Sequence, residues 1–244
     1  MDKFLRIFFT FLFSICLYIG SVDTNRAHAD VARSLQQTAD KDGYVKVLEA
    51  WAYASATTIT VPTGAVSRYQ PGDKLKLNNT TTKYFYITIV ADTLLTVTGG
   101  TDYTVANLAI SEIKVSRQSP PDFPAAFNWS PTLTGFSANP TNTVYQFYIS
   151  DGWCYVHVRQ ATNGTSNATT FWISAPVTPT TLSNAIWGNA WIEAVDNGSL
   201  IAAPGKAYAS SANSVIVVGS TMSSDNWTAA NGKRASFNLA YRIR

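Results

Sequence analysis

Cysteine and histidine are scarce in this chain of 244 residues, which contains two of each. One cysteine and one histidine fall in an N-terminal segment that resembles a signal peptide, so its removal would leave only Cys154 and His157. A single cysteine cannot form a disulfide within the chain. A lone histidine without clustered carboxylates also excludes a site built from several histidines. We therefore expect no metal ion and no other cofactor.

Charge is also scarce, because charged residues make up only 14% of the chain and its net charge is +3. Without a dense run of lysine and arginine, the chain is not expected to bind nucleic acid. Hydrophobic residues reach 46% and aromatic residues 13%, which is enough for a sizeable core. Short alternating runs separated by polar turns, with no long helical period, predict an all-β protein.

The N-terminus has the three parts of a secretory signal peptide. Two basic residues in the first six are followed by sixteen apolar or small residues, and Ala27 and Ala29 then form an A-x-A cleavage pattern. We expect removal of residues 1–29, a mature chain that starts at Asp30, secretion or display at the cell surface, and no stable insertion in a membrane afterwards. The alternative is a single membrane anchor, since sixteen apolar residues nearly span a bilayer.

The rest of the chain divides at a proline-rich segment. Residues 30–42 are a polar lead-in, and residues 43–118 contain closely spaced short strands typical of a small β-barrel or sandwich. Residues 119–125 hold three prolines, which favour an extended linker. Residues 126–244 repeat the strand pattern with longer polar loops. They predict a jelly-roll-like antiparallel β-sandwich.

Both halves resemble proteins of tailed bacteriophages. The segments "ASATTITVPTGAVSRYQPGDKLKL" and "TTKYFYITIVADTLLTVTGGTDYTVANLAI", within residues 43–118, resemble a module of tail and minor structural proteins. The segments "FNWSPTLTGF", "YQFYISDGWCYVHVRQA" and "TFWISAPVTP" are similar to the C-terminal β-sandwich of tail fibres. The resemblance implies a virion component, often a homotrimer, whose distal sandwich meets the host surface. It brings no catalytic residues, and the signal peptide departs from it.

The stretch "DGWCYVHVRQ" predicts a strand that leaves a tight turn at Asp151 and Gly152. Its alternation separates two faces, and Cys154 lies on the opposite face from the histidine, which disfavours Cys/His catalysis. The other face could be a catalytic surface, a recognition surface or a contact between subunits. Tyrosine, tryptophan and arginine are enriched at protein interfaces, so we expect this face to line a trimer contact. It consists of Trp153, Tyr155, His157 and Arg159.

A second group of aromatic residues lies in or near polar loops, beside asparagines. Aromatic rings that stack on sugars, with amides that hydrogen-bond to them, are typical of carbohydrate recognition, although buried packing is an alternative for each tryptophan. The predicted ligand-binding residues are Trp172, Trp187, Asn189, Trp191 and Trp227.

These patterns together predict a non-enzymatic structural or binding protein that contacts a cell-surface glycan or another receptor. One alternative is a secreted glycan hydrolase that uses Glu193 and Asp196, although Asp196 also reads as the start of a turn at Asn197 and Gly198. A purely structural virion spacer is the other alternative.

Overall fold

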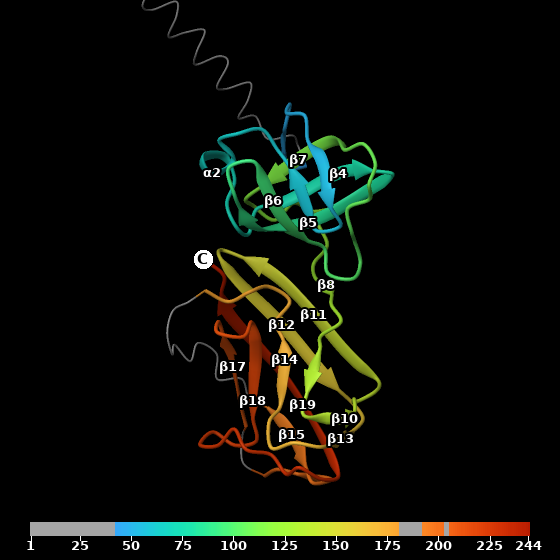
Figure 1. Ribbon diagram of the computed structural model, residues 1–244, viewed down its shortest axis with the longest axis vertical. Helices are drawn as coiled ribbons and strands as arrows, with labels where there is room; N and C mark the ends of the chain where they lie inside the picture. The colour runs from blue at the N-terminus through green and yellow to red at the C-terminus, as the bar shows by residue number, and fades with distance from the viewer. Residues whose placement is uncertain (1–41, 181–191, 203–204) are drawn as a thin grey trace, which may run out of the picture.

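A computed structural model describes residues 42–180, 192–202 and 205–244 of the chain. The expected all-β fold is confirmed in these residues, which form three antiparallel sheets (Figure 1). The predicted signal peptide at 1–29 and almost all of the lead-in at 30–42 lie outside the described residues. No helix in the described part of the chain is long and apolar enough to cross a membrane.

The N-terminal region is one curled sheet of seven strands, hydrogen-bonded in the order β1-β7-β4-β5-β6-β3-β2 (Figure 1). The strands are β1 (Val45–Lys46), β2 (Ala52–Ser55), β3 (Thr58–Thr60), β4 (Lys74–Asn79), β5 (Thr81–Val90), β6 (Leu94–Thr98) and β7 (Ser111–Ser116). A short helix, α2 (Ala65–Arg68), connects β3 to β4. Ala91 and Asp92 lie in the turn between β5 and β6, which pair as an antiparallel hairpin.

Alternation in these strands turns one side of the sheet towards a core of its own. Its members are apolar and buried, and they include Ile59, Leu75, Leu77, Phe85, Ile87 and Leu95. A hydrogen-bonded group closes this core beside α2. Glu49 accepts hydrogen bonds from Trp51 Nε1 and from the Tyr69 hydroxyl, both at 3.0 Å, and pairs with Arg68 at 2.8 Å. The carboxylate thus accepts two hydrogen bonds and forms one ion pair at the edge of the core.

The C-terminal region is a sandwich of two sheets. The larger sheet follows the order β10-β13-β19-β12-β11-β8, and β15 joins it through β19 and pairs with β16. Its strands are β8 (Phe127–Asn128), β10 (Phe136–Ala138), β11 (Thr143–Ser150), β12 (Trp153–Gln160), β13 (Gly164–Ser166), β15 (Glu193–Asp196), β16 (Ser199–Leu200) and β19 (Gly232–Arg242). The smaller sheet follows the order β17-β18-β14-β9. Its strands are β9 (Leu133–Thr134), β14 (Trp172–Ser174), β17 (Lys206–Ser210) and β18 (Val215–Gly219).

The core of the sandwich lies between these two sheets. Buried side chains of the larger sheet, such as Phe147, Val158 and Leu239, belong to the same cluster as Ile173 and Ile216 of the smaller sheet. In each strand, the side chains that belong to this cluster occupy every second position, which is the pattern of a sheet with one buried and one exposed face.

Two tight turns in the larger sheet were correctly predicted from the sequence. Asp151 and Gly152 have φ of 52° and 78° and join β11 to β12, while Asn197 and Gly198 have φ of 51° and 79° and join β15 to β16. Positive φ at both central residues is the requirement of a type I′ hairpin turn, which Asp-Gly and Asn-Gly satisfy. These turns fix the register of the strands on either side.

The segment that joins the two regions is packed. Phe123 is only 8% exposed, and its ring lies 5.0 Å from the ring of Tyr86 and 5.6 Å from that of Phe127. Asn128 donates from its backbone and from its side chain to the Asp102 carboxylate, at 2.8 and 2.9 Å. The predicted linker at 119–125 is therefore exposed at most of its residues but anchored by Phe123, whose ring contacts rings of both regions.

Candidate functional site

Every second residue of β12 points to the outer face of the larger sheet, and the residues between them point to the core. The even-numbered residues Cys154, Val156 and Val158 are buried. The odd-numbered ones face outwards: Trp153 and Tyr155 are half-buried, and His157 and Arg159 are exposed. The predicted division of this strand into two faces is confirmed. A contact between subunits on the outer face stays a prediction.

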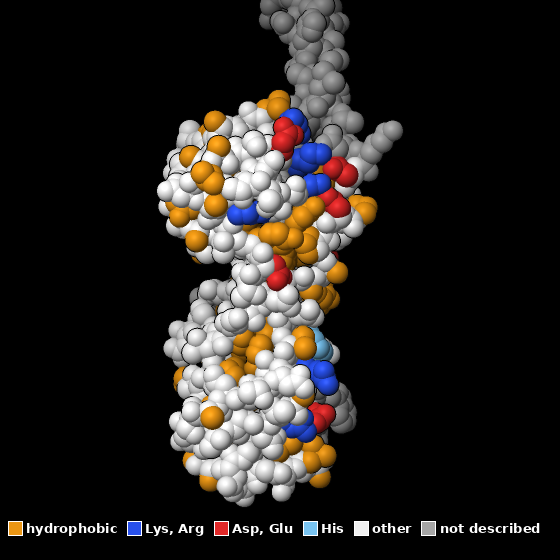
Figure 2. Space-filling model, turned by 90° about the vertical axis from the view of Figure 1, so that its right-hand side faces the viewer, with side chains coloured by type: hydrophobic (Ala, Val, Ile, Leu, Met, Phe, Trp, Pro, Cys, Tyr) orange, Lys and Arg blue, Asp and Glu red, His pale blue; other side chains and the backbone are white. Residues whose placement is uncertain are grey.

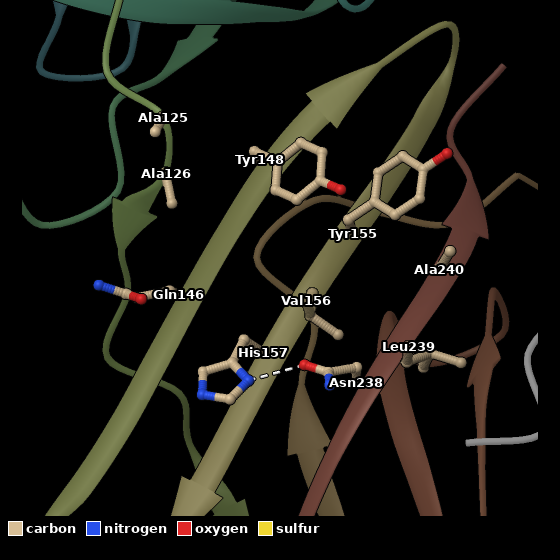
Figure 3. A pocket seen from close by; sticks show the side chains of 10 residues that line it. All are labelled: Ala125, Ala126, Gln146, Tyr148, Tyr155, Val156, His157, Asn238, Leu239 and Ala240. Carbon is tan, nitrogen blue, oxygen red and sulfur yellow. Dashed lines mark hydrogen bonds between the residues drawn. The ribbon is translucent and has the colours of Figure 1, made fainter. Parts of the chain in front are cut away.

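A pocket of about 470 Å³ opens on this face. Side chains of β11, β12 and β19 line it, and the segment just before β8 closes one side (Figure 3). The lining residues with the largest side chains are Gln146, Tyr148, Tyr155, His157 and Asn238, with the small side chains of Ala125, Ala126 and Ala240 between them. The small residues leave the space that the large ones surround.

Two stacked tyrosines form the apolar side of the pocket. Tyr148 and Tyr155 are directly opposite each other on β11 and β12, and their rings are parallel within 4° with centroids 4.7 Å apart. Tyr148 is 41% exposed, although large aromatic rings are usually mostly buried. Neither hydroxyl has a hydrogen-bond partner in the part of the chain that the structure describes. The pair offers ring surface and two hydroxyl groups to a ligand.

Amide and imidazole groups form the polar side. His157 Nδ1 lies 2.7 Å from Asn238 Oδ1 on β19, and Gln146 on β11 pairs with His157 from the other side. Since the amide oxygen can only accept, Nδ1 is the donor in this arrangement and Nε2 remains available as an acceptor. Gln146 Nε2 donates to Asn128 Oδ1 at 3.2 Å. These bonds hold the side chains in place beside the tyrosine pair (Figure 3).

The same face is positively charged at both ends. Arg159 follows His157 on β12, and Arg242 lies opposite Trp153, with its guanidinium carbon 5.6 Å from the indole ring. Neither arginine forms an ion pair within the described ranges. Figure 2 shows the one histidine of the described chain, in pale blue, with cationic side chains close by.

Of the predicted ligand-binding residues, the structure describes only Trp172 and Trp227. Trp187, Asn189 and Trp191 lie outside the described residues. Trp172 is half-buried and stands on the outer side of the smaller sheet, opposite Val217. Trp227 as a ligand-binding residue is a prediction to correct: its ring is 3% exposed, packs 5.3 Å from Phe171, and donates through Nε1 to the Val218 carbonyl at 2.8 Å. With both its ring and its donor engaged in the core, it has nothing to offer a ligand.

The groups considered for catalysis have structural partners. Cys154 is fully buried, and burial raises the pKa of its thiol to about 12. Glu193 pairs with Arg234 at 2.9 Å, and the Asp196 carboxylate accepts from the backbone and hydroxyl of Thr228 at 2.9 to 3.1 Å. Among the described residues, no three His, Cys, Asp or Glu side chains are grouped so that they could hold a metal ion.

Sequence reasoning missed three side chains of the pocket, Tyr148, Gln146 and Asn238. The first two could have been found, because a two-residue turn at 151–152 places position 148 opposite 155 and position 146 opposite 157. Asn238 could not, since the pairing of β12 with β19 joins segments about eighty residues apart, and no local pattern sets its register.

Comparison of the chain with models of protein families, with curated proteins and with solved structures finds no match.

Proposed function

We propose that this chain is a non-enzymatic binding protein that attaches to a cell-surface glycan or similar receptor through the outer face of its C-terminal sandwich. The proposal rests on one observation. A pocket of about 470 Å³ combines two stacked tyrosine rings, one exposed and one half-buried, with the amide and imidazole groups of Gln146, Asn238 and His157.

The composition of the pocket suits a saccharide. Sugars present apolar C–H faces, which pack on aromatic rings, and hydroxyl groups, which need donors and acceptors. Small-molecule sites range over roughly 300–1,000 Å³ and combine apolar walls with a few convergent polar groups. Here the Tyr148–Tyr155 pair supplies the wall and the His157–Asn238 pair supplies the polar groups. The hollow shape favours a ligand that enters it.

The packed junction between the two regions supports a presenting role. Phe123 and Phe127 connect the aromatic residues of the N-terminal sheet to the core of the sandwich. A rigid connection fixes the direction in which the outer face points, as an attachment protein requires. This agrees with the resemblance to tail and tail-fibre modules. A homotrimer and a place in a virion or at a cell surface remain part of the proposal.

Binding of the purified protein to arrays of bacterial polysaccharides, and to whole bacterial cells, tests the proposal. We expect saturable binding that Tyr155→Ala abolishes and that Tyr208→Ala leaves unchanged. Tyr208 is a suitable control because it is half-buried on β17 of the other sheet and bonds to Asp225. Absence of binding to every glycan and cell would refute the proposal in favour of a structural spacer. Cleavage of a bound glycan would instead support an enzyme.

A further inference from the structure

The outer face of the larger sheet continues beyond the pocket in both directions. Along β12 the outward positions are Trp153, Tyr155, His157 and Arg159, and their partners on β19 include Arg242, Ala240 and Asn238. The last of these positions lies six residues after the first, so the row is about 20 Å long at the rise of a β-strand. This length exceeds a single sugar ring and suits a chain of several.

Two cations stand on this row, and neither forms an ion pair with a carboxylate among the described residues. Arg242 lies at one end and Arg159 at the other, both exposed, with the tyrosine pair and His157 between them. The acidic residues nearest to this row along the chain are Asp122, Asp151, Glu193 and Asp225. Three of them form ion pairs elsewhere, with Lys76, Arg234 and Lys206 respectively for Asp122, Glu193 and Asp225, while Asp151 accepts a hydrogen bond from Ser150.

We propose that the ligand of this face is an anionic saccharide, a chain of sugar rings that carries carboxylate, sulfate or phosphate groups. This inference rests on the proposed function, because it names the ligand class of the same pocket. A sugar ring stacks on the Tyr148–Tyr155 pair, and acidic groups on neighbouring rings reach Arg159 and Arg242. Two guanidinium groups without carboxylate partners keep their full capacity for charge-assisted, bidentate hydrogen bonds.

A neutral glycan would use only the central part of this surface. Its hydroxyl groups would reach the His157–Asn238 pair, but the two arginines would contribute no ionic attraction. Nucleic acid would use the arginines and the rings, yet it would need a far denser cationic surface than two guanidinium groups provide. The spacing of two separated cations around one aromatic pair therefore favours a saccharide with intermittent negative charge.

Carboxymethyl dextran and unmodified dextran test this inference, because they share one backbone and differ in charge. With the full-length purified protein, we expect carboxymethyl dextran to bind at least about tenfold more tightly than dextran, by calorimetry or surface plasmon resonance. Arg159→Gln and Arg242→Gln should each weaken that binding about tenfold, the usual size of a charge-assisted hydrogen bond. Tyr155→Ala should weaken the binding of both polymers.

The matched control is Lys46→Gln, which removes one positive charge from an exposed residue of β1 in the N-terminal sheet. It should leave carboxymethyl dextran binding unchanged. Equal binding of the two dextrans, an equal loss in the lysine variant, or tighter binding of a single-stranded oligonucleotide would overturn the inference. Array hits that are all neutral glycans would also overturn it while leaving the proposed function intact. Failure to bind any glycan or cell would refute both.

Discussion

The two faces of one sheet have opposite roles in this molecule. On β11, Phe147 is 1% exposed and packs among Tyr86, Phe127 and Trp129, while the next residue, Tyr148, is 41% exposed and stacks on Tyr155. Neighbouring aromatic residues of similar size thus contribute to different properties. The buried face supplies the free energy of folding, and the outer face supplies a surface that a partner can contact.

The outer face is unusual because its large side chains are not needed for packing. A sheet face that meets only solvent is normally polar, and a contiguous exposed apolar patch marks a site of interaction. Tyr148 and Tyr155 could be replaced by polar residues without opening a cavity in the core. We propose that a bound partner explains their presence beside His157 and Asn238, and the predictions below test that proposal.

The largest effect on stability is expected for Phe147→Ala on the buried face. Removal of a fully buried phenylalanine leaves a cavity and lowers the free energy of unfolding by about 3–5 kcal/mol. Its matched control is Tyr148→Ala, which should cost only the stacked ring pair, about 0.5–1.5 kcal/mol. Urea denaturation followed by tryptophan fluorescence measures both. Equal losses in the two variants would contradict the division of roles between the faces.

The junction between the two regions should depend on Phe123 in a similar way. Phe123→Ala removes a ring that contacts Tyr84, Tyr86 and Phe127, and should cost about 3 kcal/mol. Limited proteolysis reports this locally: the intact protein should resist cleavage between 117 and 126, and the variant should be cut there. Rapid cleavage of the unmodified protein in this segment would instead show that the linker is open, as its three prolines suggest.

The buried side chain of Lys233 should make the stability of the protein depend on pH, which tests the packing of the inner face. Lys233 has no exposed surface, donates to the carbonyls of Ala168 and Thr170 at 3.1 and 2.9 Å, and lies among the rings of Phe136, Phe171 and Trp227. Burial lowers the pKa of its ammonium group from 10.5 to about 8. Between these values the unfolded chain binds more protons than the folded one. The free energy of unfolding should therefore rise with pH, by at most about 1.4 kcal/mol per unit.

Denaturation midpoints between pH 7.5 and 9.5 check this expectation against the Lys233→Met variant. As the pH rises, the unmodified protein should gain stability relative to the variant, because the variant lacks the titrating group. Buried tyrosines with raised pKa, such as Tyr241, titrate equally in both and cancel. A constant difference across this range would show that the ammonium group keeps its ordinary pKa despite its burial.

Local patterns predicted the fold class, but the site depends on distant pairing. Strand alternation separated Cys154 from His157, and the Asp-Gly and Asn-Gly dipeptides identified two hairpins. The prediction that Trp227 binds a ligand was wrong because its ring is inserted into the core, although the sequence around it is typical of a polar loop. The burial of Phe123 was not predicted, because prolines mark an extended chain but do not show what the chain packs against. Burial of this kind is decided by tertiary contacts, which no short window of sequence contains.

Of these variants, Tyr155→Ala should change the stability least and glycan binding most. The stacked ring pair contributes about 0.5–1.5 kcal/mol, so the variant should fold normally. If the outer face binds a saccharide, glycan binding should disappear while the sedimentation coefficient stays that of the unmodified protein. If the face is the predicted trimer contact, loss of a buried aromatic would cost about 2 kcal/mol or more at every interface, and the assembly would shift towards monomers. Sedimentation and binding measured on the same samples therefore separate the two hypotheses. Because the pocket is hollow and its polar side chains are held in place, His157 by Asn238 and Gln146 by Asn128, we expect binding to fall and the oligomeric state to remain.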